Sequence, residues 1–247
     1  MTCALIGHTG FVGSNLLAQG HWDATYNSKN IEEIRGRSFD RVVCAGAPGA
    51  KWVANEKPAD DLASIKRLID CLFDIEAALF VLISTVDVFS TVDVFGDRPY
   101  GSNRLALERF VSWKFGNHRI VRLPALFGPG LRKNVLYDLM HRHMLDRISP
   151  ESRYQWYPVR RLARDLEIIE AGPHKVVTLA TEPIETRLIC EWWFPDLKIG
   201  ERASPPVYQD VRIKHADLWG WNSPYVLNQG EVLKEMAAFL QREMVWC

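Results

Sequence analysis

The amino-acid sequence predicts an α/β fold: a Rossmann-type doubly wound parallel sheet with a small, loop-rich C-terminal substrate lobe. Two observations carry this prediction. Apolar runs typical of buried strands alternate with helical patterns along the first half of the chain. The first of these runs, 2–6, leads directly into the string Gly7-His8-Thr9-Gly10-Phe11-Val12-Gly13. The 247 residues, of which 47% are hydrophobic, are enough for one large domain with a small appendage.

The glycine string has the spacing of a phosphate-binding turn between a strand and a helix. Gly7 permits the sharp turn, Gly10 has no Cβ and lets a phosphate approach, and Gly13 lets the helix from Ser14 pack against the strand. The helix would point its N-terminal N–H groups at the anion. A glycine-rich turn without a ligand is the alternative. We therefore predict that a dinucleotide is bound by Gly7, Thr9, Gly10, Phe11, Val12 and Gly13.

The remaining elements of the first half follow in order. A second strand over 23–27 leads into 28–35, which has room only for a short helix. A buried-strand run over 41–45 ends in the loop 46–49, and a helical pattern covers 60–73. The order is completed by a strand at 79–83, a helix at 102–115 and a strand at 120–123.

Beyond Pro124 the pattern is looser. Helices are expected over 134–145 and 162–171, a strand over 175–180, and a final helix from Asn228 with Glu231 as its capping-box partner. The stretch 192–225 is rich in Pro, Gly and Trp and is typical of loops. We predict a dinucleotide-binding core over 1–130. Residues 131–247 would return partly to the core and form a small substrate lobe.

Composition limits the partners. The 30 basic and 30 acidic residues give zero net charge, and no basic stripe favours nucleic acid. No apolar run approaches the ~20 residues of a membrane span, and the first strand leaves no room for a signal peptide. The five cysteines are scattered without ligand spacing, so neither a metal site nor a disulfide framework is expected. We expect a cytoplasmic protein without nucleic-acid or membrane partners.

Polar groups follow successive strands where their carboxyl ends meet. Ser84 and Thr85 follow the fourth strand, and Tyr100 and Arg104 lie four apart at the head of a helix, on one face. A tyrosine ionises near pH ~10, and a cation beside it would lower its pKa. The hexapeptide 84–89 is repeated at 90–95, so Thr91 is a second candidate hydroxyl. Thr85 is preferred because the strand positions it.

These motifs, with Tyr-Gly-x-x-basic-Leu-x-x-Glu and Arg-Leu-Pro-x-Leu-Phe-Gly-Pro-Gly, resemble the extended short-chain dehydrogenase/reductases, the NAD-dependent epimerase/dehydratase family. The resemblance covers about residues 1–180, and the compressed segment 26–45 is most similar to the dTDP-4-dehydrorhamnose reductase branch. It implies that Thr85, Tyr100 and Arg104 are catalytic. It also implies that the cofactor's middle and nicotinamide meet Ala45, Gly46, Ala47, Ser84, Leu123 and Pro124.

Two departures bear on this resemblance. The family's lysine is Arg104, which can bond ribose hydroxyls but cannot relay a proton. The second strand ends in Asn27, Ser28 and Lys29, without the acidic residue that grips an adenosine hydroxyl. Lys29 could meet a 2′-phosphate, so the expected cofactor is NAD(P), leaning toward NADP. A solvated surface lysine is the alternative.

The resemblance implies an NAD(P)-dependent oxidoreductase or epimerase acting by hydride transfer on a nucleotide-sugar-like substrate. Candidate substrate contacts are Asn134, Trp156 and Arg160; the alternatives are a helix cap, a core aromatic and a solvated helix start. Epimerase, dehydratase and reductase are not distinguished, and a homodimer is allowed for. The second hypothesis is a catalytically weak or inactive dinucleotide-binding sensor or partner protein, motivated by Arg104 and a shortened loop before Tyr100.

Overall fold

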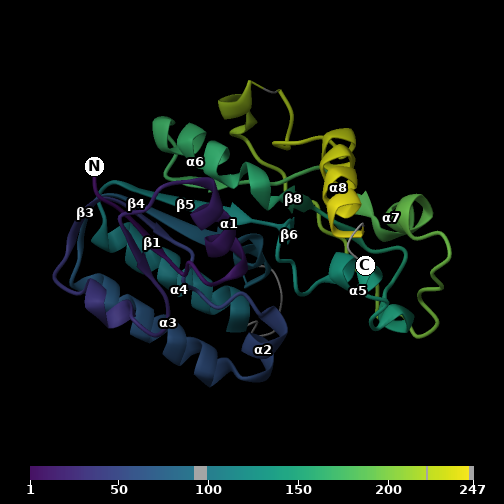
Figure 1. The fold of residues 1–247 in the computed structure, drawn as a ribbon, viewed down its shortest axis with the longest axis horizontal. Helices are drawn as coiled ribbons and strands as arrows, with labels where there is room; N and C mark the ends of the chain where they lie inside the picture. The colour runs from purple at the N-terminus through teal and green to yellow at the C-terminus, as the bar shows by residue number, and fades with distance from the viewer. Residues whose placement is uncertain (92–98, 221, 245–247) are drawn as a thin grey trace. The chain divides into compact units, whose positions relative to one another are not determined.

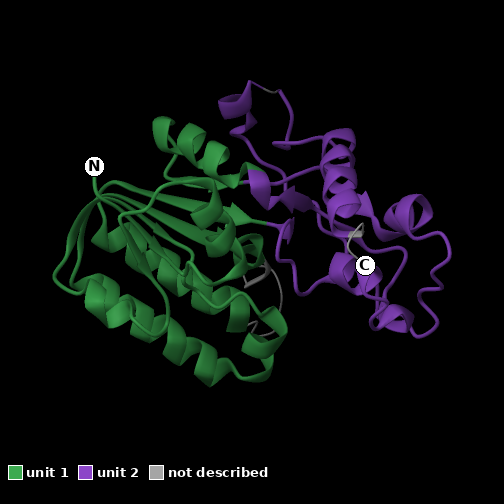
Figure 2. Cartoon of the chain, in the orientation of Figure 1, with its two compact units in different colours: residues 1–123, 161–178 green, residues 124–160, 179–247 purple. Residues whose placement is uncertain are grey.

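A computed structural model describes residues 1–91, 99–220 and 222–244. The chain forms two compact units (Figure 2). The first comprises Met1–Leu123 and Arg161–Thr178, and the second comprises Pro124–Arg160 and Leu179–Cys247. The chain thus leaves the first unit at Pro124 and returns to it for one helix and one strand.

The first unit is built on a parallel sheet of six strands in the order β2-β1-β3-β4-β5-β9 (Figure 1). This confirms the predicted doubly wound architecture. The strand order reverses between β1 and β3, and ligands of such sheets bind outside the carboxyl ends of the strands at this point. The strands are β1 (Cys3–Ile6), β2 (Ala24–Tyr26), β3 (Ser38–Cys44), β4 (Glu76–Thr85), β5 (His118–Leu123) and β9 (Val176–Thr178).

Helices cover both faces of this sheet. Figure 1 shows α3 (Pro58–Phe73) and α4 (Pro99–Lys114) on one face, and α1 (Phe11–Gln19) and α6 (Leu162–Ala171) on the other. Because both faces are covered, consecutive strand residues are buried, as along Phe80–Leu82. Three short helices complete the described part of this unit: η1 (Ile31–Ile34), α2 (Lys51–Glu56) and η2 (Val86–Thr91). The sequence analysis did not predict α2.

The second unit has two small sheets. β7 (Arg153–Tyr154) pairs antiparallel with β10 (Ile184–Glu185), and β6 (Ala125–Phe127) pairs in parallel with β8 (Trp156–Pro158). Its helices are α5 (Val135–Met140), η3 (Leu145–Arg147), α7 (Thr186–Trp193), η5 (Ala216–Trp219) and α8 (Gln229–Met244). The turn η4 (Val159–Arg161) lies where the chain passes back to the first unit.

Two of the sequence-based boundaries have clear outcomes. The helix expected over 134–145 ends at Met140 because Arg142 and Met144 take positive φ angles of 54° and 49°. The capping box of α8 is confirmed: the Glu231 N–H donates to Asn228 Oδ1 and the Asn228 N–H to Glu231 Oε2, both at 2.9 Å. None of the described helices is long and apolar enough to cross a membrane.

Candidate active site

The three glycines after β1 have three different structural roles. Gly7 has φ +85°, and a Cβ there would lie 2.3 Å from the Ala45 carbonyl oxygen. At Gly13 a Cβ would lie 2.0 Å from the Gly7 carbonyl oxygen. A Cβ at Gly10 would meet only the Gly7 oxygen, at 3.3 Å. Gly7 and Gly13 are thus required by the turn itself, whereas Gly10 presents bare backbone outward.

The N-terminus of α1 fits a pyrophosphate. Gly10 is its N-cap, no side chain caps the helix, and its first turn has no acidic residue. The first backbone bond into the helix comes from the Ser14 N–H to the Gly10 oxygen, at 2.8 Å. The N–H groups of residues 11–13 precede that bond and have no acceptor within the helix. Such an end, with its positive dipole, suits a phosphate group.

The end of β2 lies beside the glycine turn. The Gly7 N–H donates to the Tyr26 oxygen at 2.7 Å, and His8 Nδ1 lies 2.9 Å from the same oxygen. Asn27 Oδ1 accepts the Lys29 N–H at 2.8 Å, which leaves the exposed Lys29 side chain at the tip of this turn. The sequence did not single out His8, although it stands within the glycine string.

Thr85 and Tyr100 lie on two elements that pack against each other near the end of β4. Thr85 is the last residue of β4, Tyr100 lies in the first turn of α4, and the Thr85 hydroxyl acts on the phenol by lowering its pKa slightly. A rigid strand therefore positions the Thr85 hydroxyl. Of the second hexapeptide copy, residues 92–95 lie outside the described part of the chain.

The pKa of Tyr100 differs from the expectation. Arg104 stacks on the phenol ring, with Cζ 3.9 Å from the ring centroid, and its charge does lower the pKa. Burial raises the pKa by more, however, and the charges of Asp87 and Asp61 raise it further. The pKa of Tyr100 is therefore above its ordinary value, because desolvation of the phenolate outweighs one neighbouring cation.

Arg104 is held by protein groups. Its side chain is 3% exposed, and its guanidinium donates to both carboxylate oxygens of Asp61, to the Pro48 carbonyl and to the Tyr100 carbonyl. Asn103 Nδ2 also donates to Asp61 Oδ2, at 2.7 Å. The geometry therefore differs from the expectation that Arg104 holds a ribose: this side chain ties α3, α4 and the loop after β3 together.

Removing the carboxylate of this pair should destabilise the protein strongly. Asp61→Ala is expected to lower the free energy of unfolding by about 3–5 kcal/mol, because Arg104 would be left buried and unpaired. Urea unfolding of the wild type and the variant measures the difference. Asp60→Ala is the matched control: Asp60 is exposed in the same helical turn and should have a much smaller effect. Equal effects of the two substitutions would contradict the structural role of the pair.

Other expected cofactor contacts are placed as follows. Ala45, Gly46 and Ala47 follow β3 beside Gly7, and the Ala45 N–H donates to the Ile6 oxygen at 2.8 Å. The Ser84 hydroxyl is buried and donates to Glu108 Oε1 at 2.6 Å, so it is held by the protein and differs from the expected contact. Leu123 is buried at the end of β5, and Pro124 begins the second unit.

Two residues that the sequence analysis missed complete the polar cluster. Thr85 Oγ1 donates to Asp87 Oδ2 and accepts the Asp87 N–H, both at 3.1 Å. Asp87 Oδ1 is in turn ion-paired with Lys51 Nζ at the start of α2. The signal was present in the chain, since Lys51 follows the third strand and Asp87 stands two residues after Thr85.

In the second unit, two expected substrate residues have structural partners. Asn134 caps α5, with Oδ1 accepting the Tyr137 N–H at 3.1 Å and Nδ2 donating to the Leu126 oxygen at 2.9 Å. Arg160 pairs with Glu235. Trp156 differs from the expectation: it is 1% exposed and has no open ring face on which a sugar could stack.

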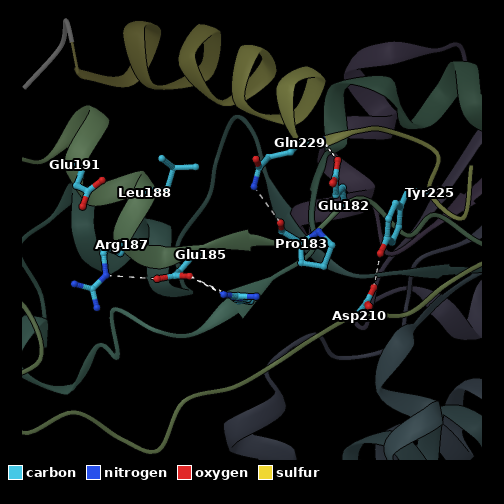
Figure 3. A pocket seen from close by; sticks show the side chains of 10 residues that line it. Glu182, Pro183, Glu185, Arg187, Leu188, Glu191, Asp210, Tyr225 and Gln229 are labelled. Carbon is cyan, nitrogen blue, oxygen red and sulfur yellow. Dashed lines mark hydrogen bonds and ion pairs between the residues drawn. The ribbon is translucent and has the colours of Figure 1, made fainter.

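The second unit also contains a polar pocket of about 530 Å³ (Figure 3). Glu185 lies between Arg153, at 3.1 Å, and Arg187, at 3.4 Å. Tyr225 donates its hydroxyl to Asp210 at 2.5 Å, and burial and this carboxylate raise the pKa of Tyr225. Carboxylates, guanidinium groups and a phenol together suit a ligand rich in hydroxyl groups. The other lining residues are Glu182, Pro183, Leu188, Glu191 and Gln229.

Comparison with known proteins shows the fold. Across 99% of this chain and 100% of the other, the structure is similar to a UDP-glucose 4-epimerase from Thermotoga maritima with UDP-glucose, with TM-score 0.73 and 16% identity. MoeE5 with UDP-glucuronic acid and NAD matches over 98% of this chain and 100% of its own, with TM-score 0.72 and 13% identity. A dTDP-4-dehydrorhamnose reductase from Clostridium acetobutylicum matches over 99% and 100%, with TM-score 0.67 and 15% identity.

No protein-family model and no curated protein matches the sequence. The structural likenesses therefore show the fold, the Rossmann-type α/β architecture that the sequence analysis expected. They do not single out one branch, because epimerases, a dehydratase and a reductase all share the architecture. The MoeE5 structures contain NAD, so these likenesses lend no support to the expected preference for NADP.

Proposed function

We propose that the protein is an NAD(P)-dependent oxidoreductase or epimerase acting on a nucleotide-sugar-like substrate. The observation that carries the proposal is the pairing of the Thr85 hydroxyl, at the end of β4, with the Tyr100 phenol, in the first turn of α4. The glycine turn follows β1 of the same sheet. The carboxyl ends of parallel strands lie at one edge, so the phosphate-binding turn and the acid/base pair share that edge.

Each residue would contribute a defined step. The N–H groups at the start of α1 hold the pyrophosphate, and the cofactor, when bound, supplies the hydride chemistry. Tyr100 gives its hydroxyl proton to the substrate's carbonyl oxygen, or takes one from its hydroxyl in the reverse direction. Thr85 orients that oxygen. Arg104, stacked on the phenol and fixed by Asp61, positions Tyr100 without touching the ligand.

For the substrate, we propose the polar pocket of the second unit. Its carboxylates would accept hydrogen bonds from sugar hydroxyls, and the Tyr225 hydroxyl would exchange hydrogen bonds with them. Arg153 and Arg187 would attract a phosphate group. Arg160 and Asn134 remain candidate contacts at other places in that unit. Arg160 is 54% exposed and can turn toward an anion, whereas the amide of Asn134 is engaged in capping.

A second function is favoured by one observation. Arg104 stands where the family has a lysine, and its guanidinium donates hydrogen bonds to Asp61 and to the Pro48 carbonyl. The pKa of Tyr100 is raised. A phenol with a raised pKa is rarely ionised near neutral pH, so little of the phenolate that would act as the base is present. This favours a dinucleotide-binding sensor or partner protein with little turnover as the alternative function.

Calorimetry and turnover assays separate the two functions. The purified protein should bind NAD or NADP, and the bound nucleotide released by denaturation should be identified by mass. Turnover is then measured with UDP-glucose, UDP-galactose and a dTDP-4-keto sugar as probes. Cofactor binding with turnover of a probe supports the enzyme. Tight binding without turnover of any probe supports the sensor, and absence of binding contradicts both.

Cofactor choice gives a separate prediction. If Lys29 meets a 2′-phosphate, Lys29→Ala should weaken NADP binding by about tenfold and leave NAD binding unchanged, since one charged hydrogen bond contributes ~1.5–3 kcal/mol. Dissociation constants of both cofactors are measured by calorimetry. Lys57→Ala, another exposed lysine of the same unit, is the control. An unchanged ratio of the two constants in Lys29→Ala would remove Lys29 from cofactor recognition.

A further inference from the structure

The polar cluster around Tyr100 contains two cations in very different situations. Arg104 is buried and donates from its two terminal nitrogens to the two carboxylate oxygens of Asp61, so its charge is largely compensated by that carboxylate. Lys51 has a side chain that is 47% exposed, and it is paired with Asp87, whose side chain is 20% exposed. Of these two cations, Lys51 is therefore the one whose side chain has room to change its position.

Asp87 connects Lys51 to the acid/base pair. One carboxylate oxygen of Asp87 contacts Lys51 Nζ, and the other accepts the Thr85 hydroxyl at 3.1 Å. The Thr85 hydroxyl in turn acts on the Tyr100 phenol and lowers its pKa slightly. A continuous chain of polar groups thus runs from a solvent-exposed ammonium to the buried phenol, through one carboxylate and one hydroxyl.

We propose that Lys51 is a positioning residue for the reaction, which neutralises Asp87 and thereby sets the charge that Tyr100 experiences. The proposal rests on the proposed function for its catalytic meaning. The expected effect of Lys51 on the charge near Tyr100 does not depend on that function, because it follows from the contacts of Lys51 and Asp87. The negative charge of Asp87 opposes formation of the Tyr100 phenolate, and removing the positive charge of Lys51 would strengthen that opposition. Among the described residues, the groups that act on the charge of Tyr100 include Arg104, Asp87, Asp61 and Thr85.

The test replaces Tyr100 by difluorotyrosine, an analogue whose phenol ionises at lower pH than that of tyrosine. Its ionisation is followed by absorbance in the cofactor-free protein. Lys51→Met, which keeps the length and removes the charge, should raise the pKa of the analogue by about one pH unit, a tenfold change in its dissociation constant. Lys51→Arg should leave the pKa close to that of the parent.

A double variant tests the route through Asp87. Asp87→Asn alone should lower the pKa of the analogue, and adding Lys51→Met to Asp87→Asn should change it little. An unchanged pKa in Lys51→Met would overturn the proposal. So would a Lys51→Met effect that persists undiminished in the Asp87→Asn background, because Lys51 would then act by another route.

Turnover provides the second readout. With a probe that the natural protein converts, Lys51→Met should lower kcat and leave KM unchanged, and Lys51→Arg should restore kcat. If no probe is converted while the pKa changes occur as expected, the proposed function fails and the charge coupling stands. If probes are converted and Lys51→Met leaves kcat and its pH profile unchanged, the role of Lys51 fails and the proposed function stands.

Discussion

Tyr100→Phe is expected to lower the turnover rate by ~10²–10⁴-fold, the contribution of a positioned acid/base group. The substitution removes only the hydroxyl that meets Thr85. The ring and its contact with Arg104, 3.9 Å from the ring centroid to Cζ, remain. Thr85 keeps its bonds to Asp87. Cofactor affinity and the unfolding midpoint should therefore change little, and the loss should appear in kcat.

The measurement is steady-state turnover of a nucleotide sugar that the natural protein converts. Tyr208→Phe is the matched control because Tyr208 lies in the second unit, is 65% exposed and is assigned no role in catalysis. A Tyr100→Phe protein with the rate of the wild type would show that another group moves the proton. Loss of cofactor binding in this variant would instead indicate a structural role for the hydroxyl.

Gly10→Val should abolish detectable dinucleotide binding while the protein stays folded. The backbone of Gly10 has φ −79° and ψ 169°, which valine adopts without strain. A Cβ there meets only the Gly7 oxygen, at 3.3 Å, so the isopropyl group extends into the space that a pyrophosphate would occupy. Calorimetry with NAD and NADP measures the binding, and thermal unfolding checks the fold.

Gly13→Val is the contrasting variant of the same turn. Its Cβ would lie 2.0 Å from the Gly7 oxygen and 2.9 Å from the His8 Cα, and backbone cannot give way cheaply. We expect a loss of about 4 kcal/mol or more in stability, the range reached by severe steric conflict. Normal cofactor binding by Gly10→Val would misplace the site. Wild-type stability of Gly13→Val would contradict the packing of α1 on the turn.

The acid/base pair shows most clearly which features of the site can be predicted from the sequence alone. Thr85 ends an apolar strand, and Tyr100 and Arg104 share a helical face four residues apart, so their proximity follows from local periodicity. The ionisation of Tyr100 could not be predicted in this way. It depends on burial and on Asp61 and Asp87, carboxylates brought in by other segments of the fold.

The features of the site that the sequence analysis missed or misplaced also depend on contacts between distant parts of the chain. Trp156 reads equally well as a ligand platform or a core residue, and only packing buries it. The Arg104 guanidinium meets Asp61 across 43 residues, and Lys51 meets Asp87 across 36. Such pairs leave no periodic signal, because neither partner's neighbours along the chain indicate which distant charge it will face.

The sequence by itself determined the strand-helix alternation, the different needs of the three glycines and the placing of Thr85 and Tyr100 at one sheet edge. Each depends on backbone sterics and on periods of two and 3.6 residues, which act over a few residues. The tertiary structure alone decided which charges are compensated, which hydroxyls are already bonded and which aromatic rings are buried. Desolvation and ion pairing depend on everything that packs around a group, and that packing is assembled from distant parts of the chain.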